Sequence, residues 1–96
     1  MMGKLTVVEA LRAVVQESND EYAKTYARAG LELGGSTNAV VVEVGGAVGI
    51  AHEKTGKVMV GEELRVQLLY VLSNLAHWRG ERAREVKAVL KEASKS

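Results

Sequence analysis

Apolar positions in the first third of the chain recur at intervals of three and four residues, which places them on one stripe of a helix over 7–33. Thr6 and Glu9 have the spacing of a capping box at its start, and Gly34–Gly35 supplies the residue that ends it. Ser18–Glu21 has the composition of a second cap. We therefore predict one long helix over 7–33, with a kink or break near Ser18 as the alternative.

The middle of the chain changes to short β-branched runs bounded by glycine and polar turns. Ala39–Val44 and Ala47–His52 are six residues each, and Lys57–Val60 returns after the turn residues Glu53–Gly56. This order predicts a three-stranded antiparallel β-meander. On the second strand one face is bulky and the other is nearly bare around Gly49, which would let a helix or another backbone approach closely.

The last third predicts two helices. Leu64 to Trp78 carries a wide apolar arc that Leu69 extends, Arg79–Gly80 interrupts the pattern, and a second amphipathic helix covers 81–93. The expected fold is therefore a single α+β domain over 1–96. It comprises a long N-terminal helix, a three-stranded antiparallel β-meander and a C-terminal antiparallel helix pair.

Composition excludes several protein classes. Of the 96 residues 47% are hydrophobic and 26% charged, which is ordinary for a globular domain and unlike a disordered or collagen-like chain. Thirteen basic against twelve acidic residues create no global field that would recruit a polyanion. The absence of Cys excludes disulfides and thiolate chemistry. The most apolar stretch, 39–51, contains Glu43 and is too short to cross a bilayer, so we expect a cytoplasmic protein without a membrane partner.

The glycine-rich segment after the first strand does not form a nucleotide-binding motif. Val44 stands where the dinucleotide fingerprint needs its first glycine, and the helix that should follow is missing. His52 and His77 are 25 residues apart with no ligand spacing around them, so we interpret both as surface or capping residues. We predict no cofactor, no metal site and no catalytic residue.

A polar stripe follows the first of the two C-terminal helices. Its members recur at steps of three and four residues and combine amides, a phenol and an imidazole: Gln67, Tyr70, Asn74 and His77. One interpretation is the solvent-facing edge of a mostly buried helix. The other is a polar seam in a groove or subunit contact, where such side chains fix orientation. A small enzyme or ligand binder working through His77, Tyr70 and Asn74 is a third hypothesis.

The C-terminal segment 79–96 holds six basic and three acidic residues. A helix pair with a basic second member could bind nucleic acid, and Trp78 could stack on a base. The competing interpretation is a solvated helix whose cations suit the dipole at its C-terminal end, since glutamates interleave the same segment and would repel phosphate. The candidate nucleic-acid-binding residues are Arg79, Arg82, Arg84, Lys87 and Lys91.

The first strand predicts self-association. Val40, Val42 and Val44 share one face and Val41 lies beside Glu43 on the other, so both faces carry valine and the helices must cover both. A symmetric dimer through Val40, Val41, Val42 and Val44 would cover what remains exposed. The expected function is a non-enzymatic interaction or regulatory module acting as a homodimer, its protein partner and pathway unknown. A nucleic-acid-binding protein is the alternative.

Overall fold

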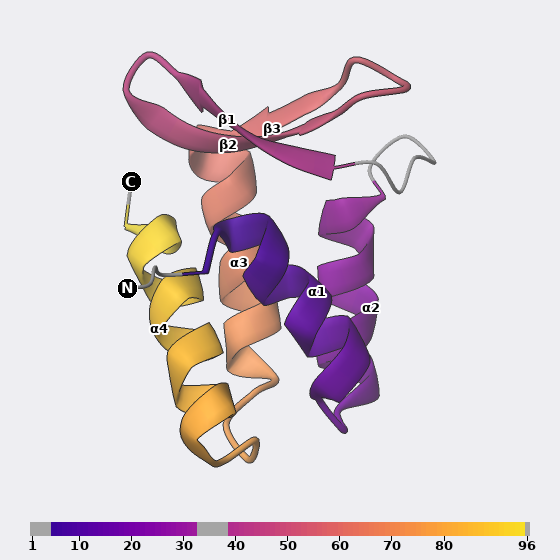
Figure 1. Ribbon diagram of the computed structural model, residues 1–96, viewed down its shortest axis with the longest axis vertical. Helices are drawn as coiled ribbons and strands as arrows, with labels where there is room; N and C mark the ends of the chain where they lie inside the picture. Colours follow the sequence, from indigo (N-terminus) through magenta and orange to yellow (C-terminus); the bar gives the residue numbers. More distant parts are fainter. Residues whose placement is uncertain (1–4, 33–38, 96) are drawn as a thin grey trace.

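Four helices and one sheet make up the computed structural model, which describes residues 5–32 and 39–95. The four helices pack around one another, each against two neighbours, and the sheet lies across the upper ends of α2 and α3 (Figure 1). The α+β class and the meander, with strand order β1-β2-β3 and antiparallel pairing, are confirmed. The elements are α1 (Val7–Glu17), α2 (Glu21–Leu31), β1 (Ala39–Val44), β2 (Ala47–His52), β3 (Val58–Val60), α3 (Gly61–Ser73) and α4 (Glu81–Ser94).

The prediction of a single helix over 7–33 is wrong in its middle. Ser18 adopts an extended conformation at the end of α1, and its hydroxyl accepts a hydrogen bond of 3.1 Å from the backbone N–H of Asp20. The carboxylate of Asp20 then accepts the N–H of Ala23 at 2.8 Å and caps α2. Short polar side chains thus offer the backbone an alternative to continuing the helix. The expected stop at Gly34–Gly35 lies outside the described residues.

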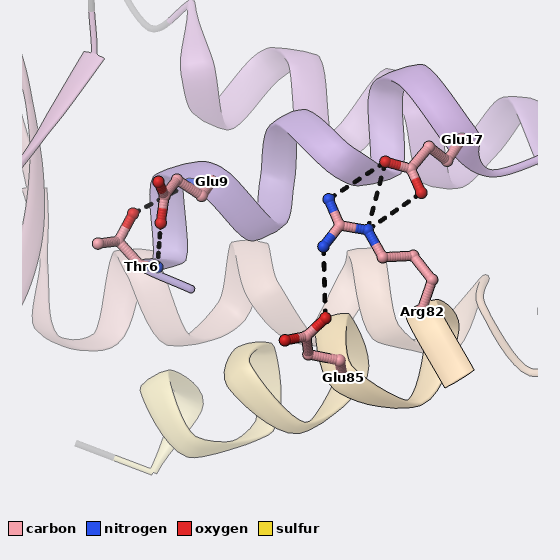
Figure 2. A network of polar contacts seen from close by, with 5 residues as sticks. All are labelled: Thr6, Glu9, Glu17, Arg82 and Glu85. Atoms are coloured by element: carbon pink, nitrogen blue, oxygen red, sulfur yellow. Dashed lines mark hydrogen bonds and ion pairs between the residues drawn. The ribbon is translucent and has the colours of Figure 1, made fainter. Parts of the chain in front are cut away.

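The predicted capping box at the start of α1 is confirmed. Thr6 accepts the backbone N–H of Glu9 at 3.1 Å, and the carboxylate of Glu9 accepts the N–H of Thr6 at 2.8 Å (Figure 2). Two of the backbone donors that a helix start leaves without partners are thereby satisfied.

Removing the cap of α2 should weaken the fold measurably. We expect Asp20→Ala to lower the free energy of unfolding by about 1 kcal/mol, because the N–H of Ala23 loses its acceptor. Urea denaturation followed by circular dichroism measures the change. Asn19→Ala, at the exposed neighbouring position, is the control and should stay within about 0.5 kcal/mol of the parent. Equal losses in the two variants would contradict the role given to Asp20.

The two hairpins follow the predicted turns closely. Gly45 and Gly46 connect β1 to β2 with φ of 58° and 85°, and positive φ at both central residues is the type I′ geometry that suits the twist of a hairpin. β1 and β2 have the predicted bounds, and β3 begins one residue later than expected. The short turn fixes the register, and the register fixes which side chains share each face of the sheet.

The face of the sheet toward the helices completes the core. Ala39, Ile50, His52 and Met59 lie on it and are all buried. The expectation that His52 lies at the surface is wrong: its side chain is fully enclosed, because β2 lies in the middle of the sheet directly above the helices. His77, by contrast, is exposed after the end of α3.

α3 is shorter than the helix predicted over 64–78. The carbonyl of Tyr70, which would accept the backbone N–H of Asn74 in a continuing helix, instead accepts the side chains of Ser73 at 3.0 Å and Asn74 at 2.9 Å. The N–H of Asn74 bonds to Val71 in a tighter turn, and the helix ends at Ser73. α4 then runs back alongside α3 in the opposite direction, within one residue of its predicted bounds (Figure 1).

Candidate functional site

Three surfaces of the described residues stand out, and the first is a groove at the corner between α3 and α4. It has a volume of about 560 Å³. Its walls come from the connection between the two helices and from one side of α4. The lining residues are Ala76, Trp78, Arg79, Gly80, Arg84, Lys87, Ala88 and Lys91, which we call the basic groove. Four of the five predicted nucleic-acid-binding residues are therefore brought together.

The fifth, Arg82, lies elsewhere and is held by carboxylates. Its Nε donates to Glu17 of α1 at 3.1 Å and its Nη1 donates to Glu85 at 3.3 Å (Figure 2). The hydrogen bond to Glu17, with a smaller contribution from Glu85, raises the pKa of the Arg82 guanidinium above its ordinary value. Arg82 thus connects α4 to α1 and does not line the basic groove.

Two of the three glutamates of α4 lie away from the cations that line the basic groove. Glu85 and Glu92 lie on the adjoining side of the helix, where they border a second hollow of about 460 Å³ between α4, the start of α1 and the sheet. Leu5, Val41, Val48 and Val89 are among its apolar lining residues. None of the described residues that line the basic groove is acidic. Glu85 and Glu92 are therefore separated in space from Arg84 and Lys91, their neighbours in the sequence, because residues three and four apart share a helix face while adjacent ones do not. Glu81, three residues before Arg84 in the first turn, is not among the residues that line the groove.

The polar stripe of α3 contacts α2 along part of its length. The side-chain amide of Gln67 donates to the backbone carbonyl of Tyr26 at 2.7 Å, and the ring of Tyr70 stacks on that of Tyr26 with centroids 5.2 Å apart. Asn74 bonds within its own helix end. His77 lines a small hollow of about 210 Å³ with Trp78 and the α1–α2 connection. Gln67 and Tyr70 thus contact α2, whereas Asn74 bonds within α3 and the side chains of Tyr70 and His77 remain exposed.

The third surface is the face of the sheet that points away from the helices. The register places on it the side chains of alternate residues, and every one of them is apolar: Val40, Val42, Val44, Ala47, Gly49, Ala51, Val58 and Val60. We call it the valine face. Val40 is 38% exposed, Val44 48% and Val58 44%. Val41, also 40% exposed, lies on the other face of β1 and borders the hollow beside α4, so the four predicted interface valines occupy two separate surfaces.

Two features of these surfaces are absent from the sequence predictions: two residues of the valine face and the whole of the hollow beside α4. Val58 and Val60 join the valine face because β3 pairs with β2 in a register that follows from the folded hairpin. The hollow bordered by Val41 combines residues of α1, the sheet and α4, which are far apart in the sequence. The continuous apolar run Val58–Met59–Val60 is the sequence signal for this strand, and it does not show which face of the sheet remains uncovered.

Comparison with known proteins finds no family model, no curated protein and no solved structure that matches the chain. Within the described residues no group of three or more Asp, Glu or His side chains is arranged to hold a metal ion. None of the four described helices has both the length and the apolar composition that a membrane crossing requires. Information about function must therefore come from the surfaces of the chain itself.

Proposed function

We propose that the protein is a non-enzymatic binding module that acts as a homodimer, with the valine face as the contact between its two copies. The observation that carries this proposal is that all eight positions on this face are apolar. Where one face of an antiparallel sheet stays in water, the residues along each strand normally alternate, with apolar side chains toward the core and polar side chains toward water. Contiguous apolar surface of this kind is typical of protein–protein contacts.

A second copy suits the geometry of this face. The face has no charged or hydrogen-bonding side chain, so the partner surface must be flat and apolar, which is what the same face of another copy provides. Two sheets that pack face to face in this way resemble the layers of a β-sandwich, about 10 Å apart. Pairing edge to edge through β1 would extend the sheet but leave the valine face in water. We therefore favour the face-to-face arrangement around a two-fold axis.

The size of the face sets the expected affinity. The six residues of β1 and β2 at about 3.3 Å each, and three strands about 4.8 Å apart, give a patch of at most about 20 Å by 14 Å, since β3 has only three residues. This is smaller than the roughly 800 Å² per partner of a standard stable interface. We therefore expect a reversible dimer of micromolar affinity or weaker, which dissociates on dilution.

The test is the oligomeric state of the protein and of two matched double variants. Val40→Lys with Val44→Lys places two charges on the valine face, and sedimentation equilibrium over about 10 µM to 1 mM should then find monomer only, while the parent associates. Leu69→Lys with Tyr22→Lys makes the same kind of change at two exposed apolar positions on α3 and α2, and this variant should associate like the parent. Circular dichroism checks that both variants are folded.

Two results would contradict the proposal. One is a parent protein that stays monomeric at the highest concentration. The other is dissociation caused by the Leu69 and Tyr22 changes but not by those at Val40 and Val44. The second result would move the contact to the surface formed by α2 and α3.

A further inference from the structure

The basic groove is a site of one charge sign. Four cationic side chains line it, and among the residues 5–32 and 39–95 no carboxylate does: the cations are Arg79, Arg84, Lys87 and Lys91. Arg79, Arg84 and Lys91 are exposed, so water and ligands reach their charged groups. The net charge of the whole chain is only +1, so this local concentration of charge is a property of the groove and not of the protein as a whole.

These cations also differ from Arg65 and Arg82 in their partners. Arg65 and Arg82 form ion pairs with Glu62, Glu17 and Glu85, whereas no described carboxylate pairs with a cation of the basic groove. An arginine already held by a carboxylate gains little from a phosphate, because the ligand must displace that partner. The four groove cations have no described carboxylate to displace, so their full charge is available to an anion.

The start of α4 adds backbone donors to the same place. Gly80 lines the groove and precedes α4 with φ of 112°, and no side chain caps the first turn of the helix. The N–H groups of a helix start attract anions through their orientation and through the helix dipole. The groove therefore combines side-chain cations with an uncapped helix N-terminus.

Trp78 distinguishes this groove from a simple anion site. Its indole is half-buried and lines the groove beside Arg79 and Gly80, and its backbone N–H bonds to the carbonyl of Leu75 at 3.0 Å, which holds the turn in place. An aromatic ring beside cations is the arrangement by which proteins hold single strands, with a base stacked on the ring and phosphates on the cations.

We propose that the basic groove binds single-stranded nucleic acid, with phosphates on Arg79, Arg84, Lys87 and Lys91 and a base stacked on Trp78. A volume of about 560 Å³ lies in the size range of sites for small ligands, which suits an individual nucleotide of a strand.

A duplex is disfavoured for two reasons. The basic side of α4 forms the wall of a concave groove, whereas a recognition helix must protrude into the major groove. Arg82, near the helix start where base edges would be read, is held by Glu17. This inference does not depend on the dimer.

The test uses fluorescence anisotropy with labelled single strands of DNA and RNA, their duplexes, and inorganic polyphosphate as competitor. We expect single strands to bind, with a slope of log K against log salt of about −2 to −3, since each phosphate contact to a single strand contributes about −0.7. Emission of Trp78, the one tryptophan of the chain, should fall on binding. Lys87→Gln with Lys91→Gln should weaken binding and reduce the magnitude of the slope by about 1.4.

Lys54→Gln with Lys57→Gln is the matched control. It removes the same charge from the β2–β3 turn, at the end of the molecule away from the α3–α4 connection (Figure 1), and should leave both affinity and slope unchanged. The proposal is overturned by an absence of binding at low salt, by tighter binding of duplexes, or by equal losses in the two double variants. Binding of single strands without any change in Trp78 emission, with polyphosphate competing equally well, overturns the stacking role and leaves a general anion site.

Discussion

Replacing Leu68 by Ala should remove a large part of the stability of this domain. Leu68 is fully buried on α3, within the core cluster that joins all four helices to the sheet. Truncation at such a site loses the transfer free energy of the removed atoms and leaves a cavity, which together cost about 2–5 kcal/mol. For a domain of this length, whose total stability is of the order of 5–15 kcal/mol, the midpoint of thermal unfolding should fall by at least about 10 °C.

The neighbouring leucine provides the control. Leu69→Ala makes the same chemical change on the same helix, but Leu69 is 42% exposed, so we expect a loss of about 1 kcal/mol or less. Both substitutions change the intrinsic helix propensity equally, and the difference between them therefore isolates burial. Urea denaturation followed by Trp78 emission and by circular dichroism measures both. A Leu69→Ala loss as large as that of Leu68→Ala would mean that the outer side of α3 is covered in solution.

Strands were easier to predict than helix ends in this chain. The bounds of β1 and β2 follow from β-branched runs cut off by a two-glycine turn, and both signals are local. The sequence favours a continuous helix through Ser18, because the apolar stripe continues across it, and only the hydrogen bonds of Ser18 and Asp20 show that the helix ends there. Leu69 continues the apolar arc in the same way and is nevertheless exposed. Periodicity identifies apolar positions without showing how much of a helix its neighbours cover.

The candidate site was predictable in composition but not in arrangement. Residues three and four apart on α4 share a face, so the closeness of Arg84, Lys87 and Lys91 follows from the sequence. The removal of Arg82 from this set depends on Glu17, which lies 65 residues earlier and meets it only because α1 packs against α4. The burial of His52 likewise results from the position of β2 at the centre of the sheet.

Gly49 is the position where the sheet should tolerate a methyl group least. The sequence suggested that its bare side admits a helix or a backbone, but the structure fills this space with a side chain of β3. A Cβ added at Gly49 would overlap Cγ1 of Val60 and lie 3.2 Å from the carbonyl oxygen of Met59. Valine is stiff about its first side-chain torsion, so Val60 cannot yield cheaply. We expect Gly49→Ala to lower the free energy of unfolding by about 1–3 kcal/mol, even though the chain entropy of the unfolded state favours Ala.

Gly30→Ala is the matched comparison and should act in the opposite direction. Gly30 is buried near the end of α2, but a Cβ there would meet only Gln67 Cγ at 3.5 Å and Leu11 Cδ1 at 3.6 Å, which are ordinary contacts. Replacing a helical glycine by alanine then raises stability by about 0.5–1 kcal/mol.

Urea denaturation of both variants, and of Gly49→Ala combined with Val60→Ala, measures the effects. If the contact with Val60 is the cause, the second substitution recovers part of the loss, and the double-mutant cycle has a coupling energy well above zero. Additive losses would instead place the cost of Gly49→Ala in the backbone of β3.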